Sequence, residues 1–251
     1  MKKSIKILSL ILLVLYAFTC SLSSQTLSGN QILKKAEETI LAPRSTVADA
    51  EMILIDKRGK KKIRKVRMWT KGKKKRVVKF LSPADVKGVG FLVLSDNEMY
   101  LYMPAFKKIR RIASHVKHQS FMGTDFSYDD ISSYEYTKHY TAKLIKETEK
   151  AYILEARRKK GSDKEYDMLK LWIDKTSFLP LKVEMYKKKK LKKVMENKKI
   201  EKIGKYWMAT HVIMVNKKKK HKTELKLTNI KFDTAVKSSI FTKRFLKRRI
   251  R

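Results

Sequence analysis

The segment Leu181-Lys182-Val183-Glu184-Met185 carries the clearest structural signal in this 251-residue chain. Apolar side chains at 181, 183 and 185 alternate with charged side chains at 182 and 184. Successive side chains of a β-strand point to opposite faces of a sheet, so the alternation predicts a strand with one buried and one solvated face. That arrangement is typical of an antiparallel sheet.

Comparable segments recur on both sides of this one. They are separated by turn signals such as Asp96-Asn97, at intervals of about 8–12 residues, which favours an antiparallel meander over alternating strands and helices. We expect strands at 47–56, 62–70, 75–81, 89–95, 98–103, 107–112, 140–147, 151–158, 165–174, 179–187, 192–202, 206–216 and 221–232. The sequence therefore predicts a mainly β protein.

Helices are few. Over 29–41, apolar residues recur at helical spacing and form one face, with Ser28 or Asn30 as the N-cap and Pro43 as the stop signal. A short helix is expected within 238–246.

Several expected strands are apolar on both faces. Met99, Leu101 and Met103, for example, interleave with Tyr100 and Tyr102. Such a sheet has to be covered on both faces, and the predicted helices are too small to cover it by tight packing. Nine of the eleven Met fall on expected strands. Met fills ordinary cores and also lines adaptable apolar sites. We favour a cavity, with Met52, Met68, Phe80, Leu101, Met103, Met168 and Trp172 as its expected lining.

The N-terminus has the order of a secretory signal peptide. Lys2, Lys3 and Lys6 precede an apolar run at 7–18, and small and polar residues follow. The run is too short to span a membrane comfortably. We expect residues 1–24 to be the signal and 25–251 to form a single domain.

Cys20 leaves a second interpretation open. In a lipoprotein signal this cysteine is acylated and anchors the chain to a membrane. Phe18 and Thr19 are poor residues just before such a cysteine, where smaller ones are usual. Both interpretations imply export.

The chain is strongly basic, with 62 Lys+Arg against 24 Asp+Glu and a net charge of +38. Export argues against a nucleic-acid partner. The scarcity of Arg, 13 of the 62 basic residues, argues against it too, because Arg predominates where bases and phosphates are gripped. Lysines gather in runs at 60–62, 73–75, 187–190 and 217–220, each between two expected strands. They are interpreted as solvated hairpin tips, or as a surface that attracts anionic lipid at about 1 kcal/mol per Lys.

No catalytic residue, metal site or cofactor is expected. His115 and His118 with Asp125 resemble a metal site only loosely, and Asp129 and Asp130 are adjacent, so their carboxylates point apart on any regular element. The chain contains none of the phosphate-loop, nucleophile-elbow, zinc-protease or dinucleotide motifs. A non-enzyme is therefore predicted.

The segment 121–130, Phe-Met-Gly-Thr-Asp-Phe-Ser-Tyr-Asp-Asp, interrupts the strand pattern. Gly123 permits a tight turn, and Thr124 or Asp125 can cap a short helix. The apolar residues of the motif offer a plug, so we expect it to pack over the mouth of the cavity as a lid. The lid residues are Phe121, Met122, Gly123, Thr124, Asp125, Phe126 and Tyr128.

This motif resembles that of the LolA-like outer-membrane lipoprotein-sorting proteins of bacterial envelopes, in the branch that carries Phe-Met-Gly-Ser/Thr-Asp-Phe-Ser-Tyr-x-Asp. The resemblance extends over nearly all of the chain after the signal. Further matches are Pro83 with Lys87-Gly88, Tyr102-x-Pro104, Trp172-Ile173-Asp174 ahead of Pro180, Trp207 and Phe241. It implies a strongly bent antiparallel sheet, a half-open barrel lidded by helices over a hydrophobic cavity, in a periplasmic protein.

Two functions follow from the resemblance. The first is a carrier or binder of acyl chains, from a lipoprotein or another lipid, working towards the outer membrane without covalent chemistry. The second is a non-carrier accessory or sensor module of an inner-membrane transporter system, with the sheet filled by its own side chains. A cavity of about 300 Å³ or more favours the first. The heavy positive charge departs from typical carriers of the family.

Overall fold

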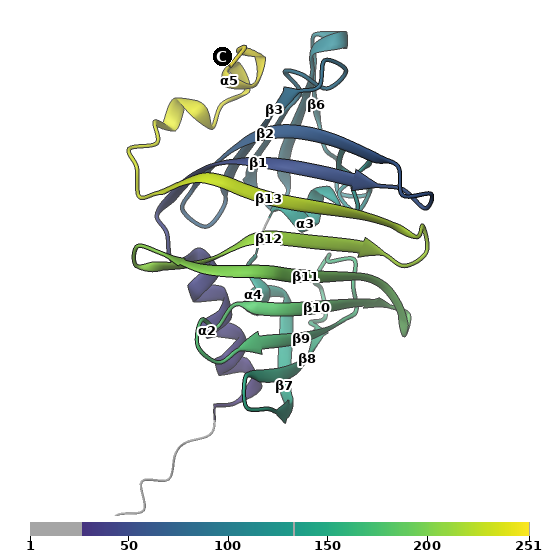
Figure 1. Cartoon of the computed structure of the whole chain (residues 1–251), viewed down its shortest axis with the longest axis vertical. Coiled ribbons are helices and arrows are strands. Elements are labelled where there is room, and N and C mark those ends of the chain that lie inside the picture. Colours follow the sequence, from purple (N-terminus) through teal and green to yellow (C-terminus); the bar gives the residue numbers. More distant parts are fainter. Residues whose placement is uncertain (1–26, 133, 251) are drawn as a thin grey trace, which may run out of the picture.

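One antiparallel sheet of thirteen strands dominates the computed structural model, which describes residues 27–132 and 134–250 (Figure 1). The strands lie in the order β6-β5-β4-β3-β2-β1-β13-β12-β11-β10-β9-β8-β7. The two edge strands do not pair, so the sheet stays open, and the predicted mainly β, half-open architecture is confirmed. The expected signal peptide and Cys20 lie outside the described residues.

All thirteen predicted strands are present, and the largest change at a strand start is that β9 begins at Met168 rather than at 165. The first six are β1 (Ser45–Ile55), β2 (Lys61–Lys71), β3 (Lys75–Ser82), β4 (Gly90–Ser95), β5 (Glu98–Met103) and β6 (Lys108–Arg111). The others are β7 (Tyr140–Glu147), β8 (Ala151–Arg158), β9 (Met168–Asp174), β10 (Pro180–Lys187), β11 (Lys190–Ile203), β12 (Tyr206–Asn216) and β13 (His221–Phe232).

The sheet consists of two meanders joined by the pairing of β1 with β13. The edge strands β6 and β7 are therefore consecutive in sequence but lie at opposite ends of the sheet. The chain between them, residues 112–139, has to cross the molecule, and we call it the crossing segment. It contains the 3-10 helix η2 (Phe121–Gly123), followed by α3 (Tyr128–Ser132) and α4 (Tyr136–His139). Another 3-10 helix, η1 (Pro104–Phe106), lies between β5 and β6.

Helix α2 (Gly29–Leu41) packs beside the second meander. Ser28 is its N-cap: its Oγ accepts a hydrogen bond from Gln31 N at 3.3 Å, and Gln31 Oε1 accepts one from Ser28 N at 2.8 Å. Asn30, the other predicted cap, instead accepts a hydrogen bond from Ala142 N of β7 at 2.8 Å. A Cβ on Gly29 would lie 2.5 Å from Leu144 N, so only glycine permits this close approach.

The C-terminal residues cover the outer face of the first meander. They form the 3-10 helix η3 (Ser238–Ile240) and the short helix α5 (Lys243–Lys247), in the predicted region. Leu246 and Phe241 pack there against Trp69, Leu92 and Tyr100. The first meander is thus covered on both faces by the chain's own segments.

On β9 the outer face is covered differently. Leu169, Leu171 and Ile173 are buried inside, so the predicted cavity residues Met168 and Trp172 belong to the opposite face. The Nζ atoms of Lys182 and Lys170 lie 4.5 and 5.2 Å from the centroid of the Trp172 ring. Lysine stems cover this face, so it needs no helix.

The alternation in β10 is broken at its start. Val183 and Met185 are buried as predicted, but Leu181 is only half-buried. The register with β9 shifts between Pro180 and Lys182, and such a bulge removes a residue from the regular alternation.

Candidate functional site

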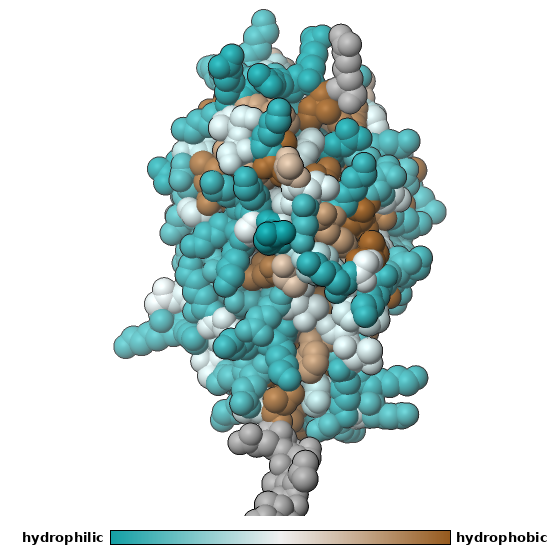
Figure 2. All heavy atoms as spheres, turned by 90° about the vertical axis from the view of Figure 1, so that its left-hand side faces the viewer, coloured by the Kyte–Doolittle hydropathy of each residue, from teal (hydrophilic) through white to brown (hydrophobic). Residues whose placement is uncertain are grey.

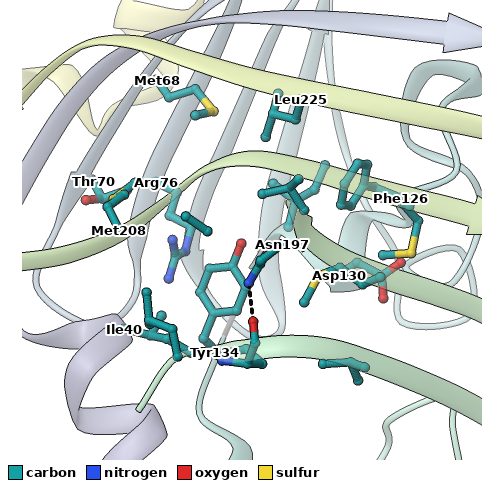
Figure 3. Close-up of a pocket in the computed structure, with 18 of the residues that line it drawn as sticks. Ile40, Met68, Thr70, Arg76, Phe126, Asp130, Tyr134, Asn197, Met208 and Leu225 are labelled. Carbon is teal, nitrogen blue, oxygen red and sulfur yellow. Dashed lines mark hydrogen bonds between the residues drawn. The ribbon is translucent and has the colours of Figure 1, made fainter. Parts of the chain in front are cut away.

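An apolar pocket of about 280 Å³ lies between the inner face of the sheet, the end of α2 and the crossing segment (Figure 3). Side chains from both meanders line it, among them Val77 and Val78 of β3 in the first meander and Leu225 of β13 and Val183 of β10 in the second. Six methionines contribute: Met52, Met68, Met185, Met195, Met208 and Met214. A wall with this many flexible thioether side chains can adapt to the shape of an apolar ligand.

Two polar side chains of the pocket, Arg76 and Asn197, already have partners within the protein. Arg76 Nε donates a hydrogen bond to Ser132 O at 3.0 Å, and its guanidinium lies 4.8 Å from the Tyr134 ring centroid. Asn197 Nδ2 donates to Pro180 O at 2.6 Å, the dashed contact in Figure 3. These groups have little capacity left to select a polar ligand, so selection has to come from apolar contact.

Three tyrosines near the pocket stay protonated. Burial raises the pKa of Tyr136, Tyr140 and Tyr166. A phenol with a raised pKa does not act as a base near neutral pH. These three tyrosines therefore supply no base to this wall.

The pocket reaches one end of the sheet. Ile40 and Pro43 at the end of α2, Thr46 at the start of β1 and Trp207 at the start of β12 line it there. This end lies on the left in Figure 1, and on that side apolar side chains show between hydrophilic ones (Figure 2). The residues that line the pocket at this end are partly exposed.

The motif at 121–130 packs against the first meander. The Phe121 ring is fully buried, 5.2 Å from the Phe91 centroid, 5.4 Å from Tyr128 and 5.8 Å from Phe80. Of the seven expected lid residues only Phe126 lines the pocket, and Asp129, Asp130 and Ile131 follow it there. The motif fills the inner face of the first meander and forms one wall of the pocket.

Two consecutive residues of the motif have left-handed backbone conformations. Met122 has φ 50° and Gly123 has φ 78°. A Cβ on Gly123 would meet no atom within 4 Å, so the requirement for glycine comes from the dihedral angle and not from crowding. The tight turn predicted at Gly123 is present.

Helix α3 is capped by Ser127, so the prediction of Thr124 or Asp125 as its cap is wrong. Ser127 Oγ accepts a hydrogen bond from Asp130 N at 3.0 Å, and Asp130 Oδ2 accepts one from Ser127 N at 2.8 Å. Thr124 and Asp125, the predicted caps, lie before this box: Thr124 Oγ1 donates to Phe121 O at 2.7 Å and closes the preceding turn. Asp125 is directed instead towards β13.

The expected cavity residues separate into three groups. Met52 and Met68 line the pocket. Phe80, Leu101 and Met103 lie in the packed cluster beneath Phe121, and Met168 and Trp172 are on the outer side of β9. Four further methionines line the pocket: Met185 of β10, Met195 of β11, and Met208 and Met214 of β12. The sequence predicts all four on strands but does not identify them as lining residues.

Among residues 27–132 and 134–250, no group of three His, Cys, Asp or Glu is arranged to hold a metal ion. Asp129 Oδ1 lies 2.8 Å from Lys164 Nζ, whereas Asp130 Oδ2 lies 2.9 Å from Lys193 Nζ, so the adjacent carboxylates have separate partners. No helix in the same part of the chain is both long and apolar enough to cross a membrane.

Comparison with solved structures identifies the family. A Vibrio parahaemolyticus domain named as an outer-membrane lipoprotein-sorting protein is 30% identical, with a TM-score of 0.78 over 86% of this chain and 98% of the other. The chain belongs to the LolA-like family of outer-membrane lipoprotein-sorting proteins.

Further structures agree with the LolA-like assignment. A DUF1329 family protein from Desulfovibrio piger is 26% identical, with a TM-score of 0.82 over 87% of this chain and 97% of the other. A LolA superfamily protein from Nitrosomonas europaea, 20% identical with a TM-score of 0.73, covers 88% of this chain and all (100%) of its own, and shows the shared fold. A family model described as "Uncharacterized protein" matches residues 72–248. A search of curated proteins found no significant match.

Proposed function

We propose that this LolA-like protein is an exported, periplasmic carrier or binder that holds an acyl chain of a lipoprotein or lipid in the methionine-lined pocket. The observation that supports this most directly is the pocket itself. Its volume of about 280 Å³ is close to the lower end of the usual range of about 300–1,000 Å³ for ligand sites. A pocket of this size suits one flexible chain better than several.

The family supports the same conclusion. The Vibrio relative is named for lipoprotein sorting, and the signal peptide predicted at 1–24 would deliver the chain to the compartment where sorting occurs. The lining of the pocket is mainly apolar, and its Arg76 and Asn197 are engaged within the protein, so binding without covalent chemistry fits better than an enzyme. The lysine runs would add attraction to an anionic membrane surface.

A second function is favoured by one specific observation. Phe121 and Tyr128 fill the inner face of the first meander, which reduces the space available to a ligand. A sheet partly filled by its own side chains is what an accessory or sensor module of an inner-membrane transporter requires. The two proposals differ in whether the remaining pocket is occupied.

Lipid bound to the purified protein distinguishes them. We expect mass spectrometry of an organic extract to detect acyl lipid carried through purification from cells. Met208→Trp, at the half-exposed end of the pocket, should lower the amount of lipid per protein several-fold. Met103→Trp is the matched control, since Met103 is also half-exposed but does not line the pocket. A wild-type protein free of lipid that binds no fatty-acid probe would overturn the carrier proposal and favour the accessory one.

A further inference from the structure

A second pocket, of about 860 Å³, lies at the end of the sheet away from Pro43 and Trp207. The strand register places two hairpin tips together here, because Lys193 pairs with Asn216 next to both turns. Lysines of these tips form one wall: Lys187, Lys188, Lys190, Lys192 and Lys193 from the β10–β11 hairpin, and Lys218 and Lys219 from the β12–β13 hairpin. We call this site the lysine pocket.

The charge of the lysine pocket is not balanced by ion pairs among residues 27–132 and 134–250. Its lining includes two carboxylates, and both have partners: Glu165 Oε1 lies 3.3 Å from Lys187 Nζ, and Asp125 Oδ2 lies 2.5 Å from His221 Nδ1. Lys193 is paired with Asp130 outside the pocket. Within the described residues, no ion pair engages the side chains of Lys188, Lys190, Lys192, Lys218 and Lys219. Five lysines that line one concavity therefore have no ion-pair partner among the described residues.

The opposite wall carries polar side chains. It comes from the crossing segment and from the loop before β9, and includes His118, Ser120, Thr124 and Tyr166. The hydroxyls of Ser120 and Thr124 donate to backbone carbonyls of the crossing segment itself. In the described part of the chain, His118 Nδ1 and Tyr166 Oη are buried without a hydrogen bond, and His118 Nδ1 lies 3.9 Å from Asp129 Oδ2. Buried polar atoms are nearly always satisfied, so both atoms are open to a hydrogen bond from outside the chain.

We propose that the lysine pocket binds a ligand that carries a phosphate group. Several ammonium groups around one cavity match an anion with more than one charge and with oxygens in three dimensions. Arg is the commoner phosphate ligand, but Lys also binds phosphate groups, as a point charge. The described lining contains seven Lys and no Arg. His118 and Tyr166 would complete the contacts to the phosphate oxygens.

The volume of the lysine pocket admits a group larger than a single phosphate ion. The phosphate can belong to a lipid head group or to a soluble phosphorylated compound. The proposal does not depend on the acyl-chain function, because the lysine pocket is separate from the apolar pocket. Among the described residues, the linings of the two pockets have one residue in common, Tyr166.

Calorimetric titration of the mature protein with three probes tests the proposal. The probes are inorganic phosphate, dihexanoyl phosphatidic acid below its micelle concentration, and dihexanoylglycerol, which has the same chains without phosphate. The test variant is Lys188→Gln with Lys219→Gln. Its control is Lys73→Gln with Lys74→Gln, which removes the same charge from the β2–β3 hairpin at the other end of the sheet.

We expect phosphatidic acid to bind and dihexanoylglycerol to bind far more weakly. Each lysine lost from the pocket should lower the affinity for phosphatidic acid about fivefold, so the double variant should lower it about 25-fold. The control should change affinity less than twofold. Strong binding of phosphatidic acid with weak binding of inorganic phosphate would assign the site to a lipid head group. Equal binding of phosphatidic acid and inorganic phosphate would assign the site to a soluble phosphorylated compound. Equal binding of the two lipids, or equal losses in the two double variants, would overturn the proposal.

Discussion

Asp125 of the crossing segment and Thr223 of β13 exchange two hydrogen bonds, although 98 residues separate them. Asp125 N donates to Thr223 Oγ1 at 3.0 Å, and Thr223 Oγ1 donates to Asp125 Oδ2 at 2.8 Å. Both residues are buried. Because β13 lies at the middle of the sheet, this contact fixes the crossing segment far from the edge strands that it connects.

Thr223→Val should therefore destabilise the protein. The change keeps the shape of the side chain but removes both hydrogen bonds, which leaves a buried amide and a buried carboxylate without this partner. We expect a loss of about 1–3 kcal/mol in the free energy of unfolding, measured by urea denaturation. Thr228→Val, at an exposed position of the same strand, is the control and should be close to neutral. Equal effects of the two changes would show that the contact has no special role.

Gly123→Val should destabilise the motif through its backbone. A β-branched residue at φ 78° is strained by about 1–2 kcal/mol, although there is space for its side chain. Gly123→Asn is the matched control, because Asn tolerates the left-handed region, and it should retain most of the stability. Lipid content should fall with Gly123→Val if the motif forms a wall of the pocket. Full stability and full lipid content in the Val variant would contradict this role.

The strands and the first helix were predictable because local patterns determine them. The turn signals and the capping residue Ser28 act within a few residues of the chain. The lining of the pocket was less predictable, since a strand that is apolar on both faces does not reveal which face is inside. Trp172 shows the difficulty: its ring is large and apolar, yet Lys170 and Lys182 cover it on the outer side. Residues distant in sequence decide that outcome.

The position of the crossing segment also depended on distant residues. Its composition predicted an apolar plug, but the plug covers Phe80 and Leu101, which were expected in the cavity. Asp125 was assigned as a helix cap from local sequence, whereas its partner Thr223 lies on β13. No short-range pattern contains the information that these two residues meet.

The buried Lys79 should make stability depend on pH. Its side chain is 1% exposed, and its Nζ donates to Leu246 O at 2.6 Å and Gly88 O at 2.9 Å. Burial lowers the pKa of Lys79 from 10.5 to about 8. Between these two values the unfolded chain binds more protons than the folded chain, so stability rises as the pH rises from about 8 to about 10.5. The contribution is lost as the pH falls through about 8.

The Lys79→Met variant isolates this contribution from the titration of other lysines. We expect wild-type stability to gain up to about 3 kcal/mol relative to the variant between pH 7 and pH 10, measured by denaturant unfolding at both values. Lys65→Met, at an exposed position on β2, should keep the wild-type pH dependence. Parallel pH profiles for wild type and Lys79→Met would show that Lys79 stays charged in the folded protein.

The lysine runs predict salt-dependent binding to membranes. The turns of the runs at 187–190 and 217–220 lie at one end of the sheet, and the run at 73–75 at the other. Binding to vesicles of anionic phospholipid should weaken steeply as salt rises past physiological strength, where the screening length is about 8 Å. Replacing the lysines of the first two runs by Gln should weaken it more than replacing those at 73–75. Salt-insensitive binding, or none, would return the lysines to a solvating role.

The apolar pocket predicts selection by chain length. Its lining is mainly apolar, so each methylene removed from water should add about 0.8 kcal/mol, or close to fourfold in affinity. About ten buried methylenes give about 8 kcal/mol before ordering costs, which corresponds to micromolar binding only where those costs are small. Affinity at that level suits a carrier, because a carrier has to release its cargo. The gain should level off once the chain fills the pocket of about 280 Å³.

Displacement of a fluorescent fatty-acid probe by saturated chains of increasing length measures this dependence. Met208→Trp should bring the plateau to shorter chains, because it narrows the pocket at its open end, whereas Met103→Trp should leave the plateau unchanged. A plateau that moves with the pocket volume assigns binding to this site and not to the exposed surface. Affinity that ignores chain length, or a plateau unaffected by Met208→Trp, would show that the methionine-lined pocket does not hold the chain.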